Sequence, residues 1–413
     1  MRSQMQGFLA DEPPARPASA DPVPGDPSPS LPIMFLHIPR TAGFTLKTML
    51  ESIFGTQRSL LDAHFYDTPK DELARYAVVE GHVRTRFFLR GFGPQWYRNG
   101  MTLVREPIAR AVSQARHTRA RPDDKRHHLV AAEVGDADEL FSRVPLWFNL
   151  QTKLLSSRPH DSVDVDDVAL EDAKATLDRM AFGLTEEFEL STALFAERWA
   201  LALPRLTRMN ASGASGDDDL RSDEFRAAAR EHNLLDLRLH EYARTVFGRR
   251  VDEYVENLLA MPLDDGRLDL VLETPGSRAD EVLAVPKGAK TTLDLGGWAL
   301  VDDRPADAVL VRAGTRTIPL CCRVFSPEAA RLARDSGRRF AGVMGRVPIS
   351  EDTEAVEVTA IDRTTMRRAQ RTIDVCRVDP EDQTEVRRGR GFRDLARRAL
   401  GARPRSGRST AWE

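Results

Sequence analysis

The sequence has little cysteine, no long hydrophobic run and almost no net charge. Its 413 residues include three cysteines, Cys321, Cys322 and Cys376, which lack the spacing of metal ligands and are typical of buried thiols in a reducing compartment. No apolar run approaches the roughly twenty residues that a membrane-spanning helix requires. Residues 1–30 contain no apolar stretch of the kind found in signal peptides. We therefore expect a cytoplasmic protein.

The net charge of −3 is small for a chain of this length. Bulk electrostatics therefore do not favour a nucleic-acid partner, and any anion-binding site must be local. The length predicts two domains with flexible ends. Changes in composition indicate a disordered leader at residues 1–30, a first domain at 31–262, a second at 266–378 and a basic flexible tail at 379–413.

A strand, a tight turn and a helix are predicted in succession over residues 31–54. The apolar run Ile33–Ile38 has the length and content of a buried strand, and Pro39 ends it. After the turn, apolar residues recur at helical spacing: Leu46, Met49, Leu50, Ile53 and Phe54. This geometry presents backbone N–H groups and the positive end of a helix dipole to an anion.

Side chains in the turn favour the same chemistry. Arg40 supplies a permanent charge, Thr41 and Thr45 supply hydroxyl donors, and Gly43 has no Cβ to keep a phosphate away from the backbone. The pattern G-x-x-x-x-G-K-[ST] of kinases and GTPases is absent, which disfavours a nucleotide kinase. The alternative is an ordinary strand–helix junction with a solvated arginine.

A second strand–helix junction follows at residues 101–115. Met101–Val104 is a predicted strand that ends at Arg105, and Pro107 suits the first position of the next helix. Arg105 and Ser113 can meet only if the strand end and the second helical turn border one pocket. The alternative is that Arg105 forms a salt bridge and Ser113 is solvated.

Two motifs resemble those of the carbohydrate sulfotransferases that use 3′-phosphoadenosine 5′-phosphosulfate (PAPS). HIPRTAGFTL, which begins at His37, is similar to their 5′-phosphosulfate loop, and VREPIARAVS, which begins at Val104, to their 3′-phosphate motif. The resemblance covers about residues 31–250 and is closest to the uronosyl 2-O-sulfotransferase branch, in a bacterial type. It implies an α/β fold with a P-loop-like parallel sheet flanked by helices.

The resemblance also implies which residues bind PAPS and release its product PAP, without a metal. The 3′-phosphate would be held by Arg105 and Ser113, and Arg40 would also act in catalysis. The 5′-phosphosulfate end would be held by Arg40, Thr41, Ala42, Gly43, Phe44 and Thr45. Arg40 replaces the family's lysine and Phe44 replaces a small hydroxyl residue, which puts full turnover in question.

His82 is the candidate general base. It follows the predicted strand Tyr76–Glu80, and its GHV context resembles the segment that supplies the base in the uronosyl 2-O-sulfotransferases. Imidazole suits removal of a proton from an acceptor hydroxyl near neutral pH. Glu80 is the alternative base, and His37, inside the first strand, is expected to be structural.

Further segments resemble family elements. Residues 145–152 contain an N-x-Q segment expected near the acceptor, and residues 232–247 form an amphipathic helix. Thr185, in the segment GLTE, is a predicted helix N-cap.

Trp96 and Tyr97 could stack on a sugar ring or fill the core. The basic stretch at 116–128 is either a solvated face or a landing area for an anionic glycan or lipid.

Short alternating segments predict a small β-sandwich at residues 266–378. Residues 293–314 are predicted to form two antiparallel strands of one hairpin. This accessory domain could bind glycan, act as a spacer or form a dimer. The basic tail could form a short amphipathic helix in peripheral contact with the inner face of the membrane, with disorder as the alternative.

Together these features predict an O-sulfotransferase that transfers the sulfuryl group of PAPS to a carbohydrate or glycolipid hydroxyl. The main rival is a catalytically impaired nucleotide- or glycan-binding protein on the same fold. Binding of PAP without sulfate transfer would distinguish the rival.

Overall fold

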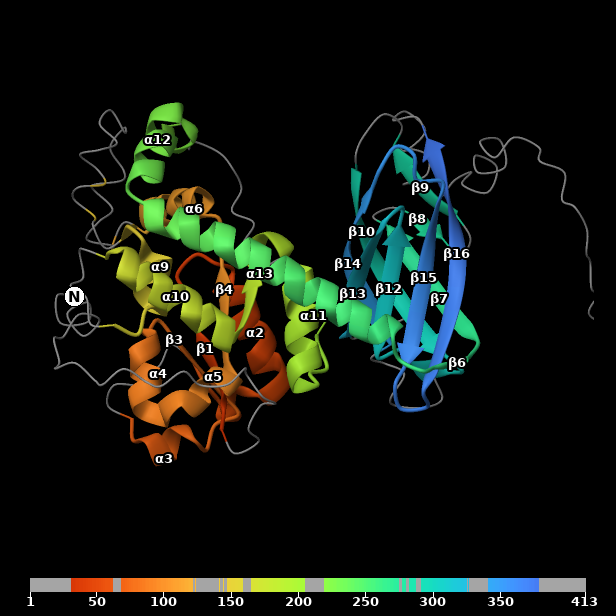
Figure 1. Ribbon diagram of the computed structural model, residues 1–413, viewed down its shortest axis with the longest axis horizontal. Coiled ribbons are helices and arrows are strands. Elements are labelled where there is room, and N and C mark those ends of the chain that lie inside the picture. Colours follow the sequence, from red (N-terminus) through yellow and green to blue (C-terminus); the bar gives the residue numbers. More distant parts are fainter. Residues whose placement is uncertain are drawn as a thin grey trace, which may run out of the picture. The chain divides into compact units, whose positions relative to one another are not determined.

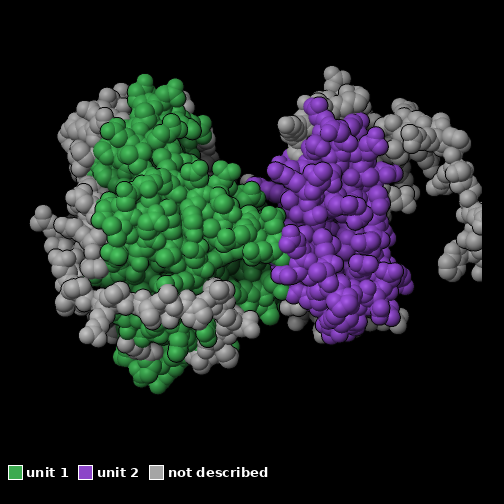
Figure 2. Space-filling model, viewed as in Figure 1, with its two compact units in different colours: residues 1–253 green, residues 254–413 purple. Residues whose placement is uncertain are grey.

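The computed structural model describes most of the chain between residues 31 and 378. The described residues are 31–61, 68–121, 123, 141, 144, 147–158, 165–204, 219–274, 277–279, 282–286, 291–324, 326 and 341–378. The predicted leader and basic tail, and residues 122 and 124–128 of the basic stretch at 116–128, lie outside them. The chain forms two compact units, residues 1–253 and 254–413 (Figure 2).

The first unit is built on a parallel sheet of five strands with helices packed around it (Figure 1). The strand order is β2-β3-β1-β4-β5, and every neighbouring pair is parallel. The strands are β1 (Ile33–Leu36), β2 (Ser59–Leu60), β3 (Val78–Gly81), β4 (Gly100–Val104) and β5 (Ala181–Leu184). The three central strands are buried along their length, as continuous apolar runs in parallel sheets are. The α/β class predicted from the sequence is confirmed.

Helices connect these strands in the order expected for parallel pairing. They are α2 (Gly43–Phe54), α3 (Lys70–Leu73), α4 (Thr85–Phe92), α5 (Trp96–Asn99), α6 (Pro107–Arg119), α9 (Leu150–Leu155), α10 (Asp167–Arg179), α11 (Phe188–Trp199), α12 (Asp223–Glu231) and α13 (Leu234–Leu259). A 3₁₀ turn, η5 (Thr185–Glu187), lies between β5 and α11. The last helix extends well beyond residue 247, where the sequence pattern predicted its end. None of the described helices is long and apolar enough to cross a membrane.

The core of the first unit lies between the sheet and its helices. Met34 and Leu36 of β1 and Val79 of β3 are fully buried there with Leu177 of α10. Trp96 belongs to the same core, since it is fully buried and stacks on Phe88, and Tyr97 is 7 % exposed. The aromatic pair therefore fills the core and is not available to a sugar ring.

The strand order contains a switch point beside β1. After β1 the chain crosses to the side of β2 and β3, and after β4 it continues to β5 on the opposite side. Because β1 and β4 are direct neighbours, their carboxyl ends border the crevice at which open α/β sheets bind ligands. Arg40 follows β1 and Arg105 follows β4.

The second unit is a mixed sheet of eleven strands that curls around one core (Figure 1). Its main path is β6-β16-β15-β12-β13-β14-β10-β7-β8, with β9 beside β16 and β11 beside β10. Both ends of the path contribute to the core, for example Leu270 of β7 and Val358 of β15. A separate β domain, as predicted, is present, and β13 joins its two halves through a register shift between Cys321 and Val324.

The strands of this unit begin and end as follows: β6 (Asp264–Asp265), β7 (Leu268–Thr274), β8 (Ser277–Ala279), β9 (Val282–Pro286), β10 (Thr291–Val301), β11 (Arg304–Pro305), β12 (Ala308–Ala313), β13 (Arg316–Val324), β14 (Gly342–Ile349), β15 (Ala355–Asp362) and β16 (Arg367–Val378). Cys321 and Cys322 are buried, as expected. The side chain of Cys376 lies outside the described atoms.

The predicted hairpin over residues 293–314 is wrong. β10 turns tightly at Asp302 and Asp303, whose φ angles are 46° and 66°, and pairs with β11 over two residues only. The next strand, β12, leaves this pair and lies between β13 and β15 in the other half of the sheet. Alternating apolar residues fix which face of a strand is buried, but do not fix its partner.

Candidate functional site

The loop after β1 has an unusual backbone. Arg40 and Ala42 have φ angles of 70° and 63°, in the left-handed region that residues with a Cβ rarely adopt. Ala42 is also the N-cap of α2, and no side chain caps the helix there. Left-handed non-glycine residues are concentrated at ligand sites. The loop therefore combines backbone strain with a helix start that lacks a side-chain cap.

Gly43 is required by packing within the protein. A Cβ built on it would lie 2.1 Å from two atoms of the His37 ring. The expectation was that glycine allows a phosphate to approach. The structure gives a different reason, because the ring of His37 occupies the space that a side chain would need.

The Thr41 hydroxyl also differs from its expected role. It is fully buried and donates to the Ile38 carbonyl over 2.8 Å, so it closes the turn after β1 and is not presented to a ligand. Thr45 lies in the first turn of α2, and its backbone N–H donates to the Ala42 carbonyl. The Phe44 side chain is 48 % exposed, although large apolar side chains are usually buried.

The arginines after β1 and β4 meet, although 65 positions separate them in the sequence. Arg105 Nη1 donates to the Arg40 carbonyl over 2.9 Å. Arg40 in turn donates from Nε to Ser113 Oγ and from Nη1 to His117 Nδ1, both over 3.1 Å. The structure therefore brings together Arg40, Arg105 and Ser113, the three residues assigned to opposite ends of the nucleotide.

His117 was missed in the sequence. Because a guanidinium can only donate, His117 Nδ1 must be the acceptor of the Arg40 bond, which fixes the ring as unprotonated at that nitrogen. The spacing in the sequence indicates this residue, because His117 lies four positions after Ser113 and therefore on the same face of α6.

This cluster concentrates positive charge away from water. Burial lowers the pKa of the Arg40 guanidinium, and the charges of Arg105 and Arg121 lower it further. Burial also lowers the pKa of Arg105, against the opposite effect of Glu186 and Glu106. Within the described part of the chain, Arg40 makes no ion pair with a carboxylate. A bound anion would relieve the repulsion and desolvation that the two guanidinium groups experience.

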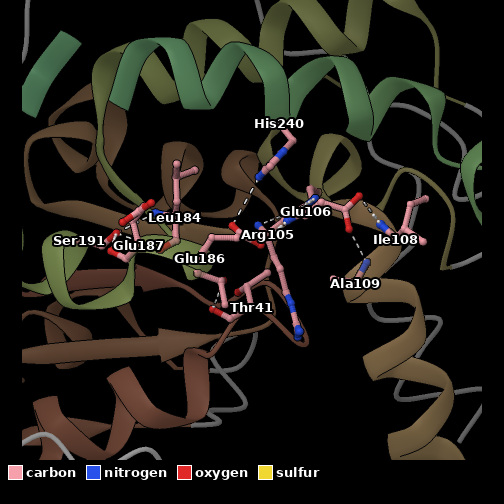
Figure 3. Close-up of polar contacts among 12 residues, drawn as sticks. Thr41, Arg105, Glu106, Ile108, Ala109, Leu184, Glu186, Glu187, Ser191 and His240 are labelled. Atoms are coloured by element: carbon pink, nitrogen blue, oxygen red, sulfur yellow. Dashed lines mark hydrogen bonds and ion pairs between the residues drawn. The ribbon is translucent and has the colours of Figure 1, made fainter. Parts of the chain in front are cut away.

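The start of α6 is satisfied by its own cap. The Glu106 carboxylate accepts hydrogen bonds from the backbone N–H groups of Ile108 and Ala109, over 3.1 and 2.6 Å (Figure 3). Pro107, which has no N–H, occupies the first helical position. An anion at this site would therefore be bound by the side chains of Arg105 and Ser113, since the helix terminus is already occupied.

The η5 turn connects the two arginine loops. Thr185 was predicted to cap a helix, but no side-chain cap is present, and its hydroxyl instead donates to the Thr41 carbonyl over 2.9 Å. The neighbouring Glu186 accepts the backbone N–H of Glu106 over 2.8 Å (Figure 3). The prediction failed because a distant carbonyl, which the sequence pattern does not reveal, competes for the hydroxyl.

Glu186 also contacts α13. His240 Nε2 lies 3.5 Å from Glu186 Oε2, and Figure 3 shows the His240 ring pointing down from the helix toward this carboxylate. Burial raises the pKa of Glu186, but the contacts with His240 and with the Glu106 N–H outweigh it, so the pKa lies below its usual value. The ionised form of Glu186 is therefore favoured in the folded protein.

Three titratable residues lie beside the end of β3. Glu80 is fully buried, and its Oε1 is hydrogen-bonded to His37 Nδ1. The His82 ring lies 4.3 Å from that of His37, measured between centroids, and its Nδ1 is 2.7 Å from the His37 carbonyl. Since a carbonyl only accepts, His82 Nδ1 carries the proton and the neutral ring has its lone pair on Nε2.

No protein-family model and no curated protein matches this sequence. Among the described residues, no group of three His, Cys, Asp or Glu side chains is placed to hold a metal ion. The geometry at the ends of β3, β1 and β4 is therefore the basis for assigning a function. It combines a cationic cluster after β1 and β4 with a histidine after β3 whose Nδ1 donates to a backbone carbonyl.

Gly43→Ala should destabilise the first unit by about 2 kcal/mol, because the new methyl group would overlap the His37 ring. Denaturant unfolding measures the change. Gly91→Ala in α4 is the matched control, since a Cβ there meets no atom within 4 Å. Combining Gly43→Ala with His37→Ala should recover part of the loss. Equal effects of the two glycine substitutions would contradict the packing role.

Glu186→Gln should remove a pH-dependent part of the stability. A carboxylate with a depressed pKa stabilises the fold above its unfolded value of about 4.3, and this contribution is lost as the pH falls through the folded pKa. The stability of wild type should therefore exceed that of the variant at pH 7, and the difference should shrink toward pH 3. The effect is modest because the side chain is partly exposed. A difference that is constant with pH would exclude the carboxylate as its source.

Proposed function

We propose that this protein is a PAPS-dependent O-sulfotransferase that acts on a hydroxyl of a carbohydrate or glycolipid. The observation that carries the proposal is the contact between the two arginine loops, in which Arg105 Nη1 lies 2.9 Å from the Arg40 carbonyl and Arg40 Nε lies 3.1 Å from Ser113 Oγ. Both sulfotransferase-like motifs therefore contribute to one cationic cluster at the sheet's switch point.

We also propose that the fold is P-loop-like. The supporting features are the central position of β1 in an all-parallel sheet and the direct passage from β1 through a tight loop into α2. The loop contains the left-handed Arg40 and Ala42, and α2 has no side-chain cap at its start. Such a junction favours an anionic group near the helix start.

The cationic cluster fits a donor that carries anionic groups on both the 3′ and the 5′ positions of its ribose. Arg105 and Ser113 would hold the 3′-phosphate, and Arg40, in the loop that would hold the 5′-phosphosulfate, is hydrogen-bonded to both residues. Preorganised cations of this kind stabilise negative charge as it develops on a leaving phosphate oxygen. The donor would supply the sulfuryl group, and the protein would supply position, charge and a base.

His82 is the proposed general base. Its Nδ1–H donates to the His37 carbonyl, so the nitrogen that can accept a proton is Nε2. Glu80 is less suited to this role, because it is fully buried and is bound to His37. His82 would take the proton of the acceptor hydroxyl while the acceptor oxygen bonds to sulfur and the bond from sulfur to the phosphate oxygen breaks.

Arg40 is the residue in which this chain departs most clearly from the family pattern. Its longer side chain reaches Ser113 and His117 on α6. Arg40 would therefore bind near the 3′-phosphate as well as near the leaving group.

A rival function, nucleotide binding without transfer, would be favoured by PAP binding in a protein that transfers no sulfate.

Donor binding is tested by calorimetry with PAP. Arg105→Ala should weaken PAP binding by about a hundredfold, because a charge-assisted contact is lost, and Ser113→Ala by about tenfold. Arg249→Ala should have no effect, since this exposed arginine on α13 pairs with Glu253 outside the cluster. Wild-type affinity retained in both Arg105→Ala and Ser113→Ala would refute the site.

Catalysis is tested with labelled PAPS and cell-surface glycan extracts. His82→Ala should abolish transfer of label while PAP still binds, because the substitution removes the base and leaves the cationic cluster intact. Glu80→Gln should retain measurable transfer. Full activity in His82→Ala would remove this residue from the mechanism and make Glu80 the better candidate.

A further inference from the structure

We propose that Gln151 is a positioning residue for Arg105 and thereby sets the preference for a nucleotide with a 3′-phosphate. This inference rests on the proposed function, since it concerns the same donor site. In the sequence, Gln151 is the last residue of the N-x-Q segment within residues 145–152, which is expected near the acceptor. Its side chain is fully buried and is directed at the backbone of the arginine loop.

Gln151 clamps Arg105 with two hydrogen bonds. The Arg105 N–H donates to Gln151 Oε1 over 2.9 Å, and Gln151 Nε2 donates to the Arg105 carbonyl over 2.8 Å. A side-chain amide carries one acceptor and two donors, so it can make the pair of bonds that a neighbouring strand would make. Arg105 is the first residue after β4, where the sheet no longer holds the backbone. Gln151 therefore continues the pattern of backbone hydrogen bonds for one residue beyond the end of β4.

Gln151 is itself held by a reciprocal pair of helix caps. Asn149 Oδ1 accepts the backbone N–H groups of Leu235 and Asp236 at the start of α13, over 3.0 and 3.1 Å. The Asp236 carboxylate accepts the N–H groups of Gln151 and Thr152 at the start of α9, over 3.1 and 2.8 Å. Each helix thus satisfies the unpaired N–H groups of the other.

The clamp lies in a fully buried, fully bonded environment. Gln151, Thr152 and Asp236 have no exposed surface, and Thr152 Oγ1 adds a third bond to Asp236 over 2.8 Å. Breaking any of these bonds would leave a buried polar group unsatisfied, so the network favours one arrangement. The backbone position of Arg105 is therefore fixed relative to α9 and α13.

The position of this backbone decides where the guanidinium lies. From this backbone position Arg105 reaches the Arg40 carbonyl with Nη1, and bonds from arginine to phosphate depend strongly on geometry. Loss of the Gln151 clamp would release this backbone without removing any charge from the site. The expected effect falls mainly on the 3′-phosphate, because Gln151 bonds directly to Arg105, whereas its hydrogen-bonded link to the 5′ loop after β1 runs through the Arg105 side chain.

The test compares PAP with AMP, which lacks the 3′-phosphate, in calorimetry on the full chain. Wild type should prefer PAP, and Gln151→Met, a variant of similar volume without the amide, should reduce this preference by about tenfold or more. AMP affinity should stay within about twofold of wild type. Ser156→Ala is the control: it removes a buried bond to Asp172 at the other end of α9, and it should leave the preference unchanged.

The outcomes separate this inference from the proposed function. An unchanged preference for PAP in folded Gln151→Met would overturn the positioning role and leave the donor site intact. An equal loss of PAP and AMP affinity would also overturn it, since the role would then be general stability. A wild type that does not distinguish PAP from AMP would overturn the proposed function itself. Should Gln151→Met fail to fold, Gln151→Asn, whose shorter amide cannot make both bonds, replaces it in the same comparison.

Discussion

Two arginine side chains that are close enough to affect each other's charge, both partly removed from water, set the main physical constraint on the first unit. Burial disfavours the charged form of both Arg40 and Arg105, and each also lies near other positive charges. Like charges separate unless the surrounding structure holds them. The bond from Arg105 to the Arg40 carbonyl, and the bonds from Arg40 to α6, provide this restraint. The result is a fixed concentration of positive charge, which a bound anion would stabilise.

The restraint extends outward through further polar contacts, exposed at Glu186 and partly buried at Thr185 and Gln151. The Thr185 hydroxyl donates a hydrogen bond to the Thr41 carbonyl in the loop after β1. Glu186 accepts the backbone N–H of Glu106, the residue after Arg105, and the Gln151 side chain donates to the Arg105 carbonyl. Asp236 and Asn149 connect Gln151 to α13. A buried polar group destabilises the fold unless it has a hydrogen-bond partner, and a hydrogen bond depends on distance and direction. Such a network therefore favours a single arrangement of these residues more strongly than apolar packing does.

Local patterns predicted much of the first unit, and their failures share one cause. The apolar runs before Arg40 and Arg105 are strands, and the helices that follow them begin close to the expected residues. Thr185 and the hairpin at residues 293–314 were predicted wrongly, and Thr41 and Gly43 have contacts within the protein that the sequence did not predict. In each case the deciding contact is one that the local pattern does not encode. The partner is distant in the sequence for Thr185 and the hairpin, and close for Thr41 and Gly43, which contact Ile38 and His37. Hydroxyl groups and strand edges can be satisfied by several partners, and only the fold selects one.

The sequence by itself determined most of the elements of the first unit, because the period of its apolar residues predicts strands and helices. The residue types at two turns predicted an anion-binding site. Only the tertiary structure decided that Arg40, Arg105 and Ser113 meet, that His82 carries its proton on Nδ1, and that Gln151 supports the arginine loop. The physical reason is that periodicity depends on neighbours within a few residues, whereas these contacts join segments brought together by the order of strands in the sheet.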